Sequence, residues 1–236
     1  MNVFGTTICR LTTDGDSVPG TSGDDTINGL VSSTSDDTTF NPADVVNGGD
    51  GEDIFDLRMI GEQGNDVSSA GRSVENVETL RAETVFAGGP AASQAADINT
   101  GDFTDLEQVV VDRLRTDDGD DTGTERDVLT LSQLTSDQGV TFTAGSGGTH
   151  IVRLAGSPNN EVTFENSNFG ILQMDTTGAG ETVTLNSDGS SNSVALELGD
   201  TDLSVPAGTG VILSAQSTSV TIRARRRRWT STAKVI

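Results

Sequence analysis

Two nine-residue segments rich in glycine and aspartate, 20–28 and 48–56, constrain the fold of this chain more than any other feature. The second reads GGDGEDIFD and fits the pattern G-G-x-G-x-D-x-U-x at every fixed position, where U is a large apolar residue. The first reads GTSGDDTIN and departs only at Thr21, which stands where the pattern has its second glycine. Each segment therefore predicts a tight turn that leads directly into a short strand.

The pattern also has a chemical interpretation. Glycine permits backbone conformations that a Cβ forbids, so main-chain carbonyl oxygens can point towards an ion. The aspartate at the sixth position, Asp25 in one segment and Asp53 in the other, adds a hard charged oxygen. Calcium takes roughly six to eight such oxygens. The pattern thus favours calcium binding. The alternative is a pair of turns that keep the shape without the ion, because Asp and Gly favour turns for backbone reasons alone.

The spacing of the two segments decides whether they can share a site. They begin 28 residues apart, whereas two nonapeptides complete a regular coil in about 18 residues. Stacking on one side of the molecule therefore requires a bulged loop within residues 30–47. A third, degraded copy follows at 61–69; it lacks the second glycine and has Ser68 where the apolar residue is expected.

These segments resemble the calcium-binding nonapeptide repeats of RTX proteins, and the layout resembles bacterial RTX-type S-layer and related secreted proteins. The resemblance rests on 20–27, 47–53 and 76–80. It implies an all-β fold, namely a right-handed parallel β-solenoid of the β-roll or β-helix type, in which successive turns share each Ca²⁺. The residues that it implies as calcium ligands are Gly20, Ser22, Asp24, Asp25, Gly48, Asp50, Asp53 and Asp66.

The remaining sequence also predicts short strands separated by Gly, Asn, Asp or Ser, such as 74–85 and 107–114. The best candidate for a helix is 90–96, and it is weak. A faint internal repeat matches 74–80 to 103–109, and a coincidence between strand-like heptads is the alternative. A recurring unit of this length is typical of a solenoid, whose coils bury their faces only against their neighbours.

The repeat in 74–80 and 103–109 has a looser third copy at 169–174. We expect four segments along the chain. They are a first strand with a polar turn (1–19), the calcium-binding turns (20–70), the repetitive solenoid (71–222) and a basic tail (223–236). The basic tail has two equally good explanations. It is either a truncated or frameshifted end of the sequence, or a basic segment with a function of its own.

Charge and cysteine content limit which cellular location and which binding partners suit this chain. The net charge is −22, and the basic residues cluster in the tail, where Lys234 is the only lysine. Such a surface repels nucleic acid and attracts divalent cations, although an arginine-preferring genome would also explain the missing lysines. Cys9 is the only cysteine, so no intrachain disulfide can form. No stretch approaches the roughly 20 apolar residues of a membrane span, and no N-terminal signal peptide is visible, which type I secretion does not require.

The sequence offers little support for a catalytic site or for a calcium site of the EF-hand type. His150 is the only histidine, and no G-x-S-x-G segment supplies a nucleophilic serine beside it. The acidic stretch 116–123 lacks the EF-hand spacing and is interpreted as a solvated loop. A polysaccharide-modifying enzyme would need a groove with several carboxylates and a basic residue, for which Arg153 is the only central candidate that we identify.

The sequence thus predicts a non-enzymatic, calcium-binding structural protein at the cell surface or outside the cell. Its expected partners are calcium, further copies of itself in a surface lattice, or a cell-surface polysaccharide. The alternatives are a calcium-independent adhesin or fibre and a polysaccharide-modifying enzyme module.

Overall fold

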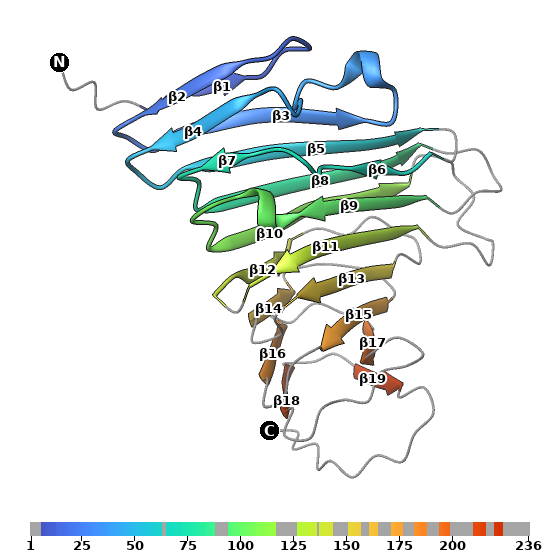
Figure 1. Cartoon of the computed structure of the whole chain (residues 1–236). Helices are drawn as coiled ribbons and strands as arrows, with labels where there is room; N and C mark the ends of the chain where they lie inside the picture. Colours follow the sequence, from blue (N-terminus) through green and yellow to red (C-terminus); the bar gives the residue numbers. More distant parts are fainter. Residues whose placement is uncertain are drawn as a thin grey trace.

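The computed structural model shows strands stacked coil upon coil along one axis, from the N-terminal to the C-terminal part of the chain (Figure 1). The structure describes residues 6–62, 65–87, 94–116, 127–135, 137–143, 151–156, 161–164, 171–176, 182–187, 194–198, 210–215 and 220–223.

Three sheets build the solenoid, and all their strand pairings are parallel. The nine-stranded sheet contains β1 (Ile8–Arg10), β3 (Thr26–Ser32), β5 (Ile54–Glu62), β8 (Thr79–Ala87), β10 (Gln108–Thr116), β12 (Gly139–Phe142), β14 (Glu161–Phe164), β16 (Thr182–Ser187) and β18 (Gly210–Ala215). The seven-stranded sheet contains β6 (Val67–Ser68), β9 (Ala95–Asn99), β11 (Val128–Leu134), β13 (Ile151–Gly156), β15 (Ile171–Thr176), β17 (Val194–Leu198) and β19 (Val220–Arg223). The three-stranded sheet contains β2 (Ser17–Thr21), β4 (Val45–Gly49) and β7 (Val74–Glu75).

The predicted fold class is confirmed as an all-β parallel β-solenoid. In the described part of the chain the only helical turns are two short 3₁₀ segments, η1 (Ser35–Asp37) and η2 (Thr100–Asp102). None of the described helical turns has the length and apolar character that a membrane span needs. Right-handed coiling stays a prediction.

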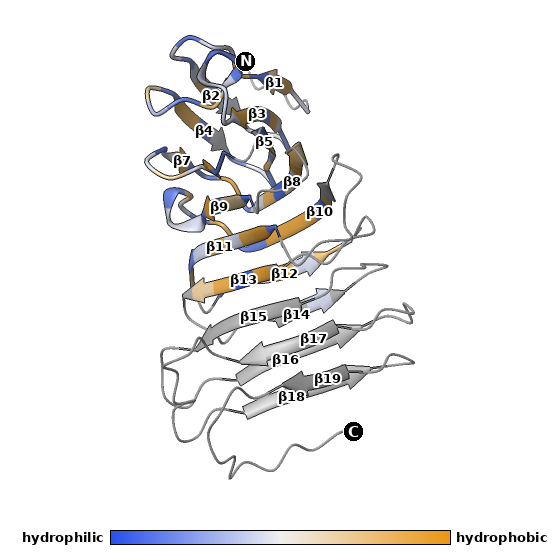
Figure 2. Cartoon of the chain, turned by 90° about the vertical axis from the view of Figure 1, so that its right-hand side faces the viewer, coloured by the Kyte–Doolittle hydropathy of each residue, from blue (hydrophilic) through white to orange (hydrophobic). Residues whose placement is uncertain are grey.

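The core follows from the alternation of side chains along each strand. On β5, Phe55, Leu57 and Met59 are buried, while the residues between them face outwards. Figure 2 shows hydrophobic stretches along the strands β8, β10 and β11. Phe55 packs on Phe40 and Phe103, with ring centroids 4.7 Å and 5.6 Å away. These rings come from three coils, so they tie the N-terminal half of the stack together.

The insert between the two glycine-rich segments forms a loop of the predicted kind. It follows β3, contains η1, and returns towards β4. The amides of Thr39 and Phe40 both donate to the carbonyl of Leu30, and Phe40 is fully buried. The extra residues are therefore accommodated outside the strand register, which continues without interruption.

The faint repeat corresponds to real stacking. Val74 bridges to Phe103, and Leu80 pairs with Val109, so 74–80 lies against 103–109 in the next coil. The third copy at 169–174 is wrong, because β15 belongs to the seven-stranded sheet whereas β8 and β10 belong to the nine-stranded one.

Two other predictions need correction. The run 74–85 is not one strand, since it is split into β7 and β8 at Asn76, which has a positive φ of 51°. The helix candidate 90–96 is wrong at its end, where β9 begins at Ala95, and residues 90–93 lie outside the described part. His150, residues 117–123 and residues 224–236 lie outside the described part as well.

Candidate functional site

The two glycine-rich segments lie one on the other at a corner of the solenoid. Asp25 directly precedes β3, Asp53 directly precedes β5, and these strands pair with Thr26 opposite Ile54. Upstream of the corner, β2 pairs with β4 so that Thr21 lies opposite Gly49. The predicted stacking of the segments, which depended on a loop between them, is confirmed.

Carboxylates link the coils at this corner in a ladder, in which Asp25 and Asp53 are buried and Glu78 is half-buried. The amide of Thr7 donates to Oδ1 of Asp25 (2.8 Å), and the amide of Asp25 donates to Oδ1 of Asp53 (2.6 Å). The amide of Asp53 in turn donates to Oε2 of Glu78 (2.7 Å). Each acid thus accepts the amide of the residue at the same corner position in the preceding coil, 18, 28 and 25 residues earlier.

Asp25 is fully occupied by donors from its own and the preceding coil. Its Oδ2 accepts from the amide of Thr21 at 2.7 Å, and the Thr21 hydroxyl lies 3.0 Å from the same oxygen. Its side chain is 2% exposed. Burial raises the pKa of Asp25, but the amides of Thr21 and Thr7 outweigh burial, so this pKa lies below its usual range. Asp25 is an ionised main-chain acceptor.

Asp53 occupies the same position one coil further on and has a different environment. It is 1% exposed, and its Oδ2 is buried without a hydrogen-bond partner among the described residues. Burial raises the pKa of Asp53, the hydrogen bond from the Asp25 amide lowers it, and the charges of Asp25, Glu78 and Asp24 raise it further. The result is a raised pKa. A cation or a proton next to Oδ2 would relieve both the burial and the repulsion.

The first glycine in each segment allows the backbone of the next coil to approach closely. A Cβ on Gly20 would lie 1.4 Å from the carbonyl oxygen of Gly48. A Cβ on Gly48 would lie 1.9 Å from the carbonyl oxygen of Asn76 and 2.4 Å from Oδ2 of Asp53. Main-chain oxygens of successive coils therefore form a column along this corner. Oδ2 of Asp53 and the carbonyl oxygen of Asn76 both lie close to Gly48.

The second segment also uses glycine for its conformation. Gly49 and Gly51 have φ of +106° and +137°, which side chains rarely adopt. Thr21 stands opposite Gly49 and is not in the left-handed region. Its amide and hydroxyl bind Asp25 instead. The Thr21 hydroxyl, which a glycine would lack, thus adds to the hydrogen bonds that the amides of Thr7 and Thr21 donate to the first aspartate.

The other predicted ligands lie on the rim of the corner or away from it. Asp24 and Asp50 are exposed and Ser22 is half-buried. Oδ1 of Asp24 accepts from the amide of Glu52 at 3.1 Å. Asp66 precedes β6 in the seven-stranded sheet, and its Oδ1 accepts from the amide of Ala95.

Asp66 therefore cannot complete the site at Asp53. The two residues lie beyond opposite ends of β5, a nine-residue strand that is roughly 25–30 Å long. The degraded copy at 61–69 does not lie at this corner, because Gly61 and Glu62 are still part of β5 and Asp66 precedes β6.

Whether the corner fits a cation depends on Asp53 and on main-chain oxygens. Among the residues that the structure describes, no group of three or more His, Cys, Asp or Glu side chains is placed to hold a metal ion. The corner fits calcium only as a site of few carboxylates, with Oδ2 of Asp53 and the carbonyl of Asn76 as its nearest oxygens. Sequence reasoning missed Asn76 and Glu78 as site residues, although both belong to the segment 76–80 on which the resemblance rests.

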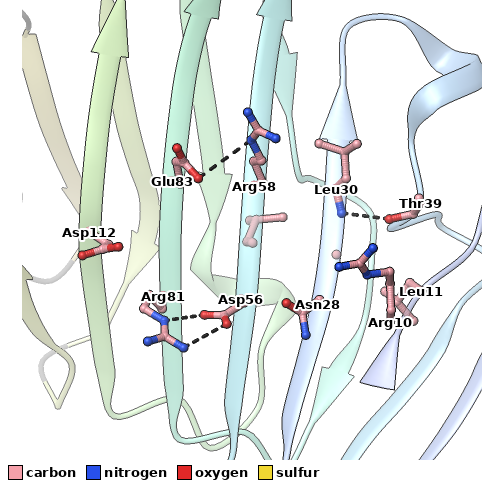
Figure 3. A pocket seen from close by; sticks show the side chains of 12 residues that line it. Arg10, Leu11, Asn28, Leu30, Thr39, Asp56, Arg58, Arg81, Glu83 and Asp112 are labelled. Carbon is pink, nitrogen blue, oxygen red and sulfur yellow. Dashed lines mark hydrogen bonds and ion pairs between the residues drawn. The ribbon is translucent and has the colours of Figure 1, made fainter. Parts of the chain in front are cut away.

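A second cluster of charged side chains lies on the outer face of the nine-stranded sheet (Figure 3). It lines an open pocket of about 600 Å³. Arg81 donates from Nη2 to Oδ2 of Asp56 at 2.9 Å and from Nε to Oδ1. Nε of Arg58 lies 3.8 Å from Oε2 of Glu83. Asp112 also lines the pocket.

The expectation that Arg153 is the only central basic residue for such a groove is wrong. Parallel stacking brings Arg58 and Arg81 beside Asp56 and Glu83, although these residues come from different coils. Both carboxylates thus lie within ion-pair distance of an arginine.

The fold and the corner define the chain as a parallel β-solenoid whose coils are joined by carboxylates. Comparison with protein families, curated proteins and solved structures finds no match to the chain.

Proposed function

We propose that this protein is a non-enzymatic structural solenoid whose N-terminal coils are stabilised by a hard divalent cation, calcium, bound beside Asp53. The observation that supports this proposal is the buried Oδ2 of Asp53, which has no hydrogen-bond partner among the described residues. A buried ionised carboxylate without a counter-charge is strongly destabilising. Calcium at Oδ2 would supply the missing partner.

The electrostatic surroundings favour a cation at the same place. Asp25, Glu78 and Asp24 all raise the pKa of Asp53 through their negative charges. The carbonyl oxygen of Asn76 lies close to Gly48, as Oδ2 of Asp53 does, and calcium binds both carboxylate and main-chain oxygens at about 2.3–2.6 Å. Water would complete the shell, as it does at many calcium sites.

A location outside the cell is part of the same proposal. Calcium outside cells reaches concentrations at which weak sites with few carboxylates, of Kd about 10⁻⁴–10⁻³ M, are filled. With a net charge of −22, the chain repels itself, and bound calcium would reduce that repulsion. A role in a surface layer, with export by type I secretion, follows from the resemblance to RTX proteins.

Calcium titration by calorimetry and thermal unfolding tests the cation site. We expect calcium to raise the Tm of the unaltered protein by mass action, because it binds the folded form. Asp53→Asn should abolish most of this rise. The matched control is Asp66→Asn, which removes the same charge beyond the other end of β5 and should retain the response.

The competing explanation for Asp53 is a bound proton. It predicts that the calcium-free protein gains stability as the pH falls towards the raised pKa of Asp53, and that calcium changes nothing at any pH. An unchanged Tm in calcium, or an equal calcium response in Asp53→Asn and the unaltered protein, would remove the cation site. A calcium-independent adhesin or fibre would then be the better interpretation.

A further inference from the structure

Arginines gather on one face of an otherwise acidic molecule. Residues 1–116 contain six basic residues, all arginines. Five of them lie on strands of the nine-stranded sheet, with Arg10 on β1, Arg58 on β5, Arg81 on β8, and Arg113 and Arg115 on β10. The side chains of Arg10, Arg58, Arg81 and Arg113 are exposed. This face therefore differs in charge from the rest of a chain whose net charge is −22.

The strand register arranges these side chains in rows across the coils. Arg10 pairs with Asn28, Asn28 with Asp56, and Asp56 with Arg81. Two residues further along the strands, on the same outer face, Leu30 pairs with Arg58 and Arg58 with Glu83. Neighbouring strands lie about 4.8 Å apart, so the side chains of each row follow one another at regular intervals along the solenoid axis.

The charged side chains in these rows differ in how closely they are paired with an opposite charge. Asp56 is held by two hydrogen bonds from Arg81, and Glu83 lies near both Arg58 and Arg113. Arg10 forms no ion pair within the described residues. Arg58 has its closest carboxylate oxygen at 3.8 Å, and its side chain is 52% exposed. The pocket thus offers two guanidinium groups, Arg10 and Arg58, to a ligand.

We propose that the pocket between Arg10, Asn28, Arg58 and Arg81 binds a segment of a carboxylated polysaccharide. A guanidinium group binds a carboxylate through two parallel hydrogen bonds. Sugar hydroxyl groups both donate and accept, so they match the paired carboxylates Asp56 and Glu83 between the arginines. The acidic remainder of the chain repels such a ligand and confines it to this face.

The lining of the pocket argues against two other anionic ligands. It contains no aromatic side chain, whereas single-stranded nucleic acid binds through bases stacked on aromatic rings. Its carboxylates, Asp56, Glu83 and Asp112, would repel a phosphate polymer with closely spaced charges. A carboxylated sugar chain also carries charges, but its hydroxyl groups can donate to these carboxylates, which an inorganic phosphate polymer cannot do.

Binding of a short oligogalacturonate to the full chain tests the proposal, measured by calorimetry with calcium removed by EDTA. We expect Arg10→Gln combined with Arg58→Gln to weaken the Kd at least about tenfold, because each charge-assisted hydrogen bond is lost. Arg153→Gln, on β13 of the other sheet, removes an arginine elsewhere and should leave the Kd within about twofold.

The basic tail requires a second variant, because Arg223 and Arg225 to Arg228 could also attract a polyanion. Replacing these five arginines by glutamine should leave oligogalacturonate binding intact. Loss of binding in that variant alone would overturn the pocket, as would unchanged binding in the Arg10 and Arg58 double variant. Equal binding of neutral dextran would overturn the role of the ligand carboxylates. Because calcium is absent, these results are independent of the cation site at Asp53.

Discussion

The corner at Asp25 and Asp53 and the outer face at Asp56 and Glu83 use the same chemical group in opposite ways. At the corner, the buried Asp25 and Asp53 and the half-buried Glu78 accept main-chain amides from the preceding coil. On the outer face, partly exposed carboxylates accept from arginine side chains. The corner acids occupy matching positions in successive coils, whereas Asp56 and Glu83 lie in different rows, opposite Arg81 and Arg58.

The difference shows which acids hold the fold and which are available for binding. A buried amide that loses its acceptor costs about 1–3 kcal/mol, so the corner carboxylates are structural. An exposed ion pair contributes about 0–1 kcal/mol, so Arg58 and Arg81 could exchange part of their contacts for a ligand at little cost. The number of acids in the sequence therefore overstates the number that could serve a partner.

The largest expected effect comes from adding a methyl group to the corner. Gly48→Ala would place a Cβ 1.9 Å from the carbonyl oxygen of Asn76, and the stacked backbones cannot move apart without breaking the ladder. We expect a loss of at least about 3 kcal/mol in the free energy of unfolding, measured by urea denaturation. Gly71→Ala is the control, since φ there is +84° but no atom lies within 4 Å of the added carbon. It should cost only about 1–2 kcal/mol.

Removing a carboxylate from each region compares the corner with the face directly. Asp25→Ala would leave the amides of Thr7 and Thr21 without their acceptor, and we expect a loss of about 2–4 kcal/mol. Asp56→Ala breaks the ion pair with Arg81, and we expect a loss of at most about 1 kcal/mol. Urea denaturation of both variants measures the difference, and equal losses would contradict the assignment of structural and available acids.

The two corner aspartates should respond to pH in opposite directions. The lowered pKa of Asp25 means that its ionised form stabilises the fold above the unfolded pKa, and this contribution disappears as the pH falls through the folded pKa. The raised pKa of Asp53 means that its protonated form is favoured in the fold, so its contribution declines as the pH rises through the folded pKa.

Calcium-free unfolding from about pH 3 to pH 7 separates these contributions. We expect Asp25→Asn to lose stability near neutral pH and to approach the unaltered protein in acid. Asp53→Asn should lose less near neutral pH, because the amide carries no buried charge. The opposite order of the two variants near neutral pH would show that the environments of these residues are assigned the wrong way round.

The smallest expected effect concerns salt. Arg81→Gln removes the exposed pair with Asp56 and should lower the free energy of unfolding by at most about 1 kcal/mol. This loss should shrink further in about 1 M NaCl, where exposed charges are screened within about 3 Å. The effect of Asp25→Ala should persist in salt, because its partners are buried amides. Urea denaturation at low and high salt makes the comparison.

Much of the fold was predictable because it depends on local patterns. The glycine and aspartate positions predicted the two turns, Phe55 and Ile27 marked the strands that follow, and the offset between 74–80 and 103–109 predicted stacked coils. The position of Asp66, away from the corner at Asp53, has a simple reason. A local match to 61–69 cannot show that β5 continues through Gly61, because the length of that strand is fixed by its pairing with β8.

The sequence by itself determined that the chain forms short parallel coils with acidic, glycine-bent corners, since turn chemistry and strand alternation depend on neighbouring residues. Only the tertiary structure decided what each acid does. Stacking at offsets of 18, 28 and 25 residues places Thr7, Asp25, Asp53 and Glu78 in one column. The same stacking brings Arg10, Arg58 and Arg81 to one face. Burial and hydrogen-bond partners come from the neighbouring coil, and the identity of that neighbour is not contained in any local stretch of sequence.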